Sequence, residues 1–303
     1  MTPPKVQTTL APFQAPVQRQ APAPLHDDAA YVWRCVYPWA SQLTRLIVLA
    51  SGLADDVTLD LHPTQGLTIR QVETTQVAMT ELCMQPDAWL VWQLGGVPHS
   101  VTLFAEQVKR LDKLSRQDHV IVLYQTRDTA DMVRVRLYSD TSDRVFSLHC
   151  NNMGRADVPI LPWRDWPYAG HATLPAAAFA EEVTACVESK STYVRLGVRP
   201  PDRLEFTTYT DTSQNGAQAY ASEVPCTTMH SAPASVDACR YAVLFLKEFA
   251  VFRDVAAVVD VKWASPGRPL VLAYHVCPPA KAGPGGGQVV GMLTAMLMDR
   301  ELD

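Results

Sequence analysis

Residues Trp39–Val72, WASQLTRLIVLASGLADDVTLDLHPTQGLTIRQV, contain the structural unit that decides the fold. Leu43, Leu46 and Ile47 recur at helical spacing, which indicates a helix with one apolar face. The residues that follow alternate between apolar and polar side chains around a proline- and glycine-containing segment, a pattern typical of two strands joined by a tight turn. The predicted elements are a helix over Trp39–Ala50, a strand over Val57–Leu61, a turn over His62–Gly66 and a strand over Leu67–Val72.

The same unit of helix, strand, turn and strand recurs three more times along the chain. The predicted helices of these copies cover Phe104–Arg116, Ala176–Glu188 and Arg240–Phe252. Their strands are Val120–Tyr124 with Met132–Tyr138, Tyr193–Val198 with Arg203–Tyr209, and Val258–Trp263 with Pro269–Val276. Leu43 and Phe179 lie 136 positions apart. Phe104 and Tyr241 lie 137 positions apart, so the first two copies together correspond to the last two.

This duplication predicts two similar domains, at residues 31–150 and 172–303. Residues 1–30 alternate proline with alanine, glutamine and threonine without an apolar period, and are predicted to form a disordered tail. Residues 151–171 contain Pro159, Pro162 and Pro167 and are predicted to form an extended linker. Further strands are expected at Val77–Met84, Trp89–Leu94, Val145–Cys150, Ala217–Ser222 and Val289–Met296. Strand-rich halves with two helices each indicate an α+β fold, with antiparallel sheets and both helices on one face.

Exposed sheet edges favour aggregation unless they are paired. Pairing of such edges head to tail between copies of the chain can close into a ring.

The composition describes a globular protein that does not grip nucleic acid over its whole surface. The chain has 26 basic and 31 acidic residues, a net charge of −5, whereas non-specific grip on phosphates comes from lysine and arginine. No apolar run approaches the roughly 20 residues that span a bilayer, and no secretory signal pattern is present. A soluble intracellular protein without membrane contact is expected. The seven cysteines are scattered and never spaced C-x-x-C, which favours reduced thiols over disulfides or a zinc site.

Patterns that indicate catalysis are absent from the sequence. The eight histidines include no pair at i and i+4 and no H-E-x-x-H, and neither G-x-S-x-G nor G-x-G-x-x-G occurs. The run Gly283–Gly287 lacks the Lys-Ser/Thr of a phosphate loop and is interpreted as a hairpin. The chain is therefore predicted not to be an enzyme, and to use neither a metal nor a cofactor.

Four stretches match the pattern of a known family in order and spacing. Residues 66–79, GLTIRQVETTQVAM, form a turn glycine, a strand, a short polar loop and a second strand. Thr173-Leu174-Pro175 precedes the third helix, and Tyr241–Leu246 lies in the fourth. Pro269–Tyr274 reads Pro-Leu-x-x-x-Tyr. From about Tyr31 to Asp299 the chain resembles the proliferating-cell-nuclear-antigen (PCNA) family of DNA sliding clamps, as a distant member for which a viral source is one option.

The resemblance implies a homotrimeric ring of six similar domains that encircles double-stranded DNA without reading its sequence. Such a ring tethers DNA polymerase and other replication and repair proteins. The helices would line the hole and the sheets would form the outer wall. The strand near Arg144–His149 of one subunit would pair with Ala217–Ser222 of the next. The expected location is the nucleus or a viral replication compartment.

The second helix offers the clearest candidate for a DNA-facing surface. Phe104, Val108 and Leu111 fall on one side at helical spacing, and basic residues fall on the other. A basic stripe suits passing contact with phosphates, although an ordinary solvated helix face is the alternative. The candidate DNA-binding residues are Arg45, Lys109, Arg110, Lys113, Arg116, Lys190 and Lys247. Glu181 and Glu182 occupy the third helix where the family has basic residues, so weak DNA contact is expected in the second domain.

Partners of this family dock a short peptide in an apolar pocket between the linker and the C-terminal segment. The resemblance places that pocket at Val72, Val77, Met79, Ile160, Leu161, Trp163, Pro269, Met292, Leu293, Thr294 and Ala295. Apolar residues in a proline-rich linker suggest a docking surface, and the alternative is that they pack onto their own domain. Met292–Leu297 departs from the family's Tyr-Leu-Ala-Pro-Lys pattern, so partner motifs are expected to differ.

Two other interpretations remain open. The same fold could serve an open monomeric or dimeric processivity factor, like those of herpesviruses, which binds DNA by a basic face. The net charge of −5 disfavours this form, because an open factor needs a stronger electrostatic grip. A duplicated fold could also serve an enzyme or a scaffold unrelated to DNA. Sedimentation separates a closed ring from an open form.

Overall fold

The computed structural model describes residues 20–26, 30–151, 158, 160–168, 170–199, 202–209, 218–231, 240–263, 269–278 and 289–298. The first half of the chain contains β1 (Tyr31–Tyr37), α1 (Ala40–Ala50), β2 (Asp56–His62), β3 (Gly66–Val72), β4 (Ala78–Met84), β5 (Val91–Gln93), β6 (His99–Phe104), α2 (Ala105–Leu114), β7 (Val120–Thr126), β8 (Met132–Ser139) and β9 (Ser142–His149). The second half contains β10 (Gly170–Pro175), α3 (Ala176–Glu188), β11 (Tyr193–Arg199), β12 (Arg203–Tyr209), β13 (Gln218–Pro225), β14 (Thr228–Ser231), β15 (Tyr241–Ala242), α4 (Val243–Ala250), β16 (Ala256–Trp263), β17 (Leu270–Val276) and β18 (Gly291–Leu297). Short 3-10 turns are η2 (Pro86–Ala88), η3 (Trp163–Asp165) and η4 (Val251–Asp254).

The two halves repeat one another in element order and in strand pairing. In the first half β1 pairs with β5 and β7, β2 with β3 and β6, β3 with β4, and β8 with β7 and β9. In the second half β10 pairs with β14 and β16, β11 with β12 and β15, β12 with β13, and β17 with β16 and β18. Every pairing in one half has its counterpart in the other, which confirms the predicted tandem duplication.

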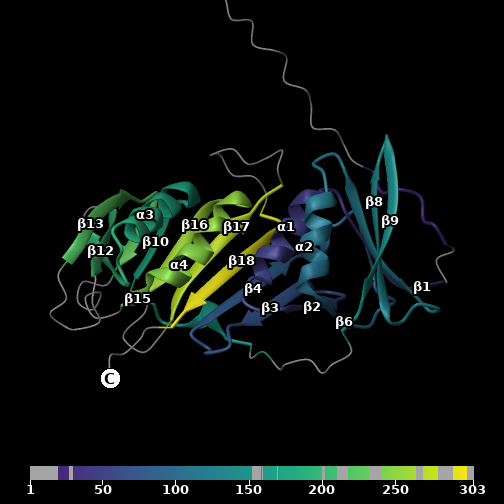
Figure 1. The fold of residues 1–303 in the computed structure, drawn as a ribbon, viewed down its shortest axis with the longest axis horizontal. Coiled ribbons are helices and arrows are strands. Elements are labelled where there is room, and N and C mark those ends of the chain that lie inside the picture. Colours follow the sequence, from purple (N-terminus) through teal and green to yellow (C-terminus); the bar gives the residue numbers. More distant parts are fainter. Residues whose placement is uncertain are drawn as a thin grey trace, which may run out of the picture.

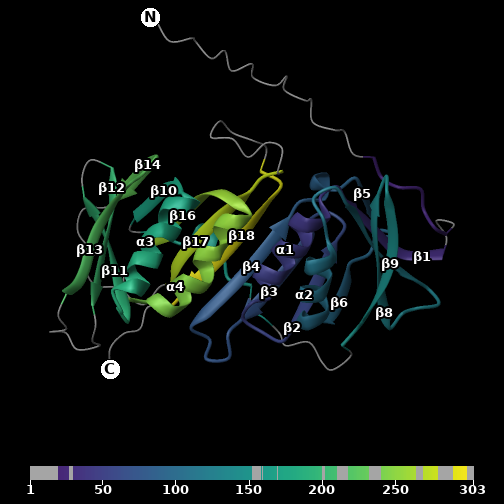
Figure 2. The same ribbon diagram turned by 45° about the horizontal axis from the view of Figure 1, so that its top comes forward.

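One further pairing joins the halves. β18 pairs antiparallel with β4, from Gly291 opposite Met84 to Leu297 opposite Ala78. This contact merges strands of both halves into a nine-stranded sheet, while a five-stranded sheet ends at β9 and a four-stranded sheet ends at β13. The described helices α1 to α4 all lie on the same face of the nine-stranded sheet, and the two smaller sheets stand at opposite ends of the molecule (Figures 1 and 2).

The main core lies between the sheets and the helices. It contains the helical residues Leu43, Val108, Phe179 and Phe249, which are buried as the helical spacing predicted. Side chains at alternating strand positions point into this core, and the others point to the outer face, which we define as the sheet surface turned away from the main core. This alternation decides which predicted site residues can meet.

Several element boundaries differ from the sequence predictions. The fourth helix begins at Val243 rather than Arg240, because Tyr241 and Ala242 pair with β11. Phe104 belongs to β6 and is 42 % exposed, so it is not part of the apolar face of α2. β10 begins at Gly170, inside the segment predicted as linker, where a Cβ would lie 2.2 Å from the Trp263 ring.

Part of the segment predicted as a disordered tail has a defined position. Arg34 and Arg136 donate hydrogen bonds to the carbonyls of Pro22 and Ala23, so residues 20–26 lie against the outer face of the five-stranded sheet. Buried guanidinium groups require acceptors, and these carbonyls supply one to each arginine. Residues 1–19 and 27–29 lie outside the described residues.

Cys35, Cys150, Cys186 and Cys226 are free thiols that lie in the main core or pack against it. Burial raises the pKa of Cys35 and raises the pKa of Cys186 to about 12, so both are protonated at neutral pH. Cys239 lies outside the described residues. None of the helices in the described part of the chain is long and apolar enough to cross a bilayer.

Candidate nucleic-acid interface and partner-docking face

The basic stripe of α2 lies on the helix surface opposite the core. Val108 and Leu111 are 2 % and 4 % exposed, while Lys109, Arg110 and Lys113 are exposed. Arg110 lies 3.4 Å from Glu106 one turn earlier, and both side chains are more than 60 % exposed. Such a surface pair contributes under about 1 kcal/mol, so Arg110 can exchange it for a phosphate. Arg116 is also exposed, two residues beyond the end of α2.

Arg45 is engaged within the protein. Its Nη2 lies 3.0 Å from Asp254 Oδ2 and its Nη1 lies 4.0 Å from Asp112 Oδ2. The Asp254 contact links α1 of the first half to η4 of the second, and the Asp112 contact links α1 to α2. Asp112 also accepts a hydrogen bond from Thr44 at 2.8 Å. Arg45 therefore offers less net charge to a phosphate than the α2 lysines do.

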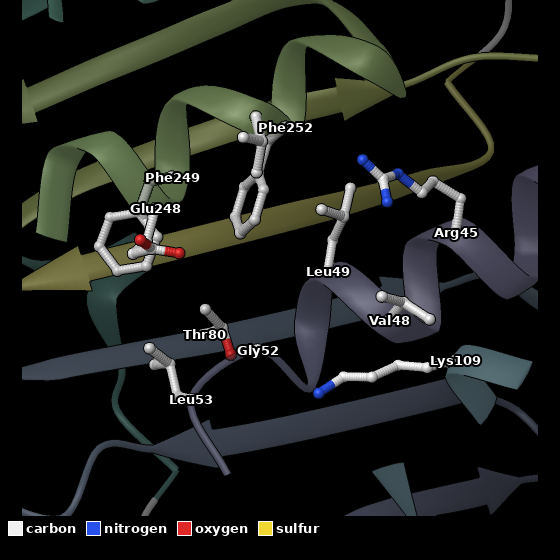
Figure 3. Close-up of a pocket in the computed structure, with 11 residues that line it drawn as sticks. Arg45, Val48, Leu49, Gly52, Leu53, Thr80, Lys109, Glu248, Phe249 and Phe252 are labelled. Carbon is white, nitrogen blue, oxygen red and sulfur yellow. The ribbon is translucent and has the colours of Figure 1, made fainter. Parts of the chain in front are cut away.

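A cavity of about 210 Å³ lies between α1 and α4, where the two halves meet on the helical face. Figure 3 shows Leu49, Phe249 and Phe252 along its wall and Arg45 and Lys109 at its edges. The cavity is lined mainly by apolar side chains, so the two halves are joined here by packing as well as by the ion pair of Arg45 with Asp254.

The second half presents fewer cations on its helical surface. Glu181 and Glu188 are the exposed charged residues of α3. On α4, exposed Lys247 is followed by exposed Glu248, and Leu244 is 65 % exposed. Lys190 follows α3 in a left-handed conformation, with φ 56°. Glu182 is half-buried and accepts a hydrogen bond from Tyr220 at 3.0 Å.

The predicted peptide pocket does not form as one surface. Leu293 and Ala295 are fully buried in the main core, on the helix side of the sheet. Met292 and Met79, by contrast, belong to a cluster on the outer face. The assignment of Leu293 and Ala295 to an outer pocket was therefore wrong, because consecutive strand residues point to opposite faces. Thr294 pairs with Glu81 on the outer side but is also fully buried.

Trp163 fills the centre of the outer-face cluster. It is 2 % exposed and packs with Met79, Val271, Ala273 and Met296, with Val72 and Leu161 at the margin. Its Nε1 donates to Glu81 Oε2 at 3.1 Å, and Glu81 Oε1 lies 2.8 Å from Arg70 Nε. The buried indole therefore anchors the linker to the sheet. For Trp163, packing onto the protein itself holds, rather than the docking surface that the sequence suggested.

The other predicted pocket residues are also divided between exposed and buried positions. Ile160 is 72 % exposed, whereas Pro269 is buried. Val77 packs against the main core, and its carbonyl accepts a hydrogen bond from the amide of Met298 at 2.8 Å. Met298 is 39 % exposed. Met296 and Met298 were missed, although strand alternation from Met292 indicates that all three share one face.

An open groove lies beside the linker. It has a volume of about 610 Å³ and runs between the β2–β3 turn and the linker. Its lining includes Thr64, Gln65, Arg70, Ile160 and Arg164. With exposed Ile160 at its rim and arginines in its wall, this groove is mixed in character rather than apolar.

A polar cluster lies on the outer face of the second half. Asp260 accepts hydrogen bonds from Thr173 at 2.7 Å and from His275 at 2.9 Å, and His171 lies 3.4 Å away. Burial alone would raise the pKa of Asp260, but the His275 and Thr173 hydrogen bonds outweigh it and lower the pKa to about 2. Among the described residues, no group of acidic, histidine or cysteine side chains could hold a metal ion.

Comparison with known proteins identifies the fold. No protein-family description matches the sequence, and no curated protein matches it. Among solved structures, the chain is similar to the crystal structure of proliferating cellular nuclear antigen from Entamoeba histolytica, with a TM-score of 0.74, 14% identity, and coverage of 89% of this chain and 100% of the other. It is also similar to the PCNA2–PCNA3 complex from Sulfolobus tokodaii, with a TM-score of 0.71, 15% identity, and coverage of 88% and 99%. The chain has the PCNA-like sliding-clamp fold.

Proposed function

We propose that this chain is a subunit of a ring-shaped sliding clamp, a non-enzymatic processivity factor that encircles double-stranded DNA and tethers DNA polymerase and other replication and repair proteins. Such a ring would act in the nucleus or in a viral replication compartment. The observation that carries the proposal is the pairing of β4 with β18 inside one chain. The strands that end the two smaller sheets, β13 and β9, are the counterparts of β4 and β18, so the same pairing can form between two chains.

The strand correspondence makes this argument specific. β9 is the last strand of the first half, as β18 is of the second, and β13 corresponds to β4. In the described part of the chain β9 and β13 each end a sheet with one neighbour. The contact that joins the two halves can therefore be repeated between β9 of one copy and β13 of the next. A head-to-tail contact of this kind closes into a ring when its rotation allows.

The side chains also match across this proposed contact. In β4 and β18 the core-facing residues Leu82 and Leu293 lie opposite one another. Phe146 of β9 and Tyr220 of β13 both pack at the margin of the main core. Placing Phe146 opposite Tyr220 sets Val145 opposite Ala221 and extends the core across the joint. This register agrees with the pairing that the family resemblance implied.

A charge exchange tests the joint without disturbing either core. Val145 is 47 % exposed and pairs with Arg136 of β8, so a glutamate there faces a cation within its own subunit, and Ala221 is exposed. Opposed like charges on paired strands are destabilising, and opposed unlike charges are favourable. Val145→Glu with Ala221→Glu should yield single subunits in native mass spectrometry. The matched pair Val145→Glu with Ala221→Lys should keep the ring. Identical masses for the two variants would overturn the proposed register.

The helical face fits a surface over which DNA slides. Ring topology retains the DNA, so contacts can be few, and the exposed cations of α2 supply them. Each phosphate contact contributes roughly 0.9 to the slope of log affinity against log salt. Lys109→Gln with Lys113→Gln should therefore flatten that slope by about 2 for each subunit in contact. Lys247→Gln, beside Glu248, should change it by less than 1. Equal effects of the two variants would remove the assignment of α2 as the main DNA contact.

Partner docking is proposed at the linker and its neighbouring groove. Trp163 already fills the outer-face cluster, so a partner meets Ile160, Met298 and the rim of the groove rather than an empty apolar pocket. A fluorescent peptide from a clamp-binding polymerase should lose affinity on Ile160→Asp. The same change at exposed Leu25, in the segment against the five-stranded sheet, is the control. An unchanged affinity at Ile160 would place docking elsewhere.

A further inference from the structure

The outer face of the five-stranded sheet carries a second small cluster of buried apolar residues. It contains Tyr31, Val36, Val120, Val122 and Tyr124, which are all less than 9 % exposed. Alternation along β1 would turn Tyr31 to the side of Trp33 and Cys35, which lie in the main core. A register shift between Tyr31 and Trp33 reverses this, because a bulge re-aims the side chain. The outer face is thus built to be covered.

Residues 20–26 provide part of this cover. Arg34 Nη2 donates to the Pro22 carbonyl at 3.0 Å, and Arg136 Nη1 donates to the Ala23 carbonyl at 2.7 Å. The Tyr31 hydroxyl accepts hydrogen bonds from the amides of Leu25 at 3.1 Å and His26 at 3.2 Å. Four successive contacts therefore follow the main chain of the segment.

The ring contacts at the end of the segment are equally specific. The His26 ring lies 5.8 Å from the Tyr31 ring and 6.1 Å from the Tyr124 ring. The two tyrosine rings meet edge to face at 5.5 Å. These aromatic contacts hold His26 at the end of the cluster.

The two arginines explain why a proline-containing segment fits. Arg34 and Arg136 are each only 7 % exposed, and burying a guanidinium without acceptors is costly. The carbonyls of the extended segment supply one acceptor to each guanidinium. Pro22 and Pro24 hold that chain extended before it binds, and proline has no amide that would be left without a partner. Pro22 is buried in the contact.

We infer that the outer face of the five-stranded sheet is a peptide-binding groove whose ligand is the extended segment Gln20–His26 of the same chain, and that the bound segment braces the edge strand β9. The bracing acts through Arg136. Its Nε and Nη2 bind both carboxylate oxygens of Asp143 on β9 at 2.8 and 2.6 Å, while its Nη1 holds Ala23. Asp143 lies two residues from Val145, so this second part rests on the proposed ring.

Binding of the segment in trans tests the groove. A chain lacking residues 1–26 should bind a fluorescein-labelled QAPAPLH peptide saturably in an anisotropy titration, whereas a scrambled peptide should not bind. The full chain, whose groove is occupied, should bind it at least tenfold more weakly. Tyr31→Phe in the shortened chain removes the acceptor of two amides and should weaken binding about tenfold. Tyr138→Phe makes the same chemical change on the same sheet and should leave binding unchanged. Equal binding by these two variants, or no binding to the unsubstituted shortened chain, would overturn the groove.

Hydrogen exchange in the full chain keeps the inference testable if the shortened chain does not fold. The Leu25 and His26 amides should be protected, and Tyr31→Phe should remove most of that protection while Tyr138→Phe keeps it. Rapid exchange of both amides in the unsubstituted chain would contradict the inference.

Bracing of β9 is tested by two truncations. Removal of residues 1–19 should leave ring dissociation unchanged, whereas removal of residues 1–26 should raise the dissociation constant at least tenfold, and added QAPAPLH should restore it. Peptide binding without any change in ring dissociation would overturn the bracing and keep the groove. A full chain that forms no ring would refute the proposed function, while the peptide titration would still decide the groove.

Discussion

The linker is held mainly by Trp163, and replacing this residue by alanine should release the linker without unfolding the domains. The indole is 2 % exposed among Met79, Val271 and Met296. Truncating a buried tryptophan to alanine costs about 3–5 kcal/mol. The change also removes a hydrogen bond to Glu81, although Glu81 keeps its contact with Arg70. Because linker residues can detach locally, most of this cost should appear as local opening.

Amide exchange at the linker measures that opening. The Asp165 amide donates to the Pro162 carbonyl at 3.0 Å, so its exchange reports whether η3 is formed. A loss of about 3–5 kcal/mol corresponds to exchange roughly 10²- to 4 × 10³-fold faster, at about 1.4 kcal/mol per factor of ten. Trp163→Phe keeps most of the packing but leaves Glu81 Oε2 without the indole N–H, and should accelerate exchange by roughly 5- to 100-fold.

Ile160→Ala is the matched control for this experiment. Ile160 belongs to the same segment but is 72 % exposed, so its truncation should leave exchange at Asp165 within about twofold. If Trp163→Ala were as mild as Ile160→Ala, the indole would not be the anchor that its burial indicates, and the linker would be held by other contacts.

Three further predictions concern the stability of the fold. The pKa of Asp260 is about 2, so its hydrogen bonds stabilise the protein above pH 4. This contribution, about 2 kcal/mol, should be lost as pH falls from 4 to 2. In urea unfolding, the difference in free energy of unfolding between the wild type and Asp260→Asn should shrink over that range. Gly66 has φ 84°, and a Cβ there would lie 1.9 Å from a backbone oxygen, whereas Gly96 has φ 82° and a Cβ there would meet nothing within 4 Å. In thermal unfolding, Gly66→Ala should therefore lower the free energy of unfolding by at least about 2 kcal/mol more than Gly96→Ala. Arg70→Met leaves the buried Glu81 carboxylate without its cation and should cost about 3–5 kcal/mol in urea unfolding. Arg110→Met, in an exposed pair, should cost under about 1 kcal/mol. Equal costs would mean that Arg70 does not stabilise the buried carboxylate.

Long periodic segments could be predicted from the sequence because their signal is local. The third helix has the predicted bounds, Ala176–Glu188, since its apolar residues recur at helical spacing without interruption. The start of the fourth helix was predicted too early because Tyr241 and Ala242 fit a helical pattern, and pairing with β11 overrides it. β1 was missed because both its faces are largely buried and its register shifts near Tyr31. Tertiary pairing decided each of these differences.

The site was less predictable because it depends on contacts between distant residues. Exposure of the α2 cations followed from helical spacing alone. Burial of Trp163 depends on Glu81, 82 positions earlier in the chain, and no local pattern reveals that partner. Leu293 and Ala295 could have been excluded from the outer face by strand alternation, once Met292 was placed there. The proline-rich composition of residues 20–26 indicated disorder. The segment is held by buried arginines on β1 and β8, which are distant in sequence, so its own composition does not reveal these partners.

Native mass spectrometry of the full chain at micromolar concentration and moderate salt tests the central claim most directly. If the β9 and β13 edges repeat the β4–β18 contact, the dominant species should have three times the mass of one chain, with no intermediate open polymer. A dominant species of one or two chains under these conditions would contradict a closed ring that encircles DNA.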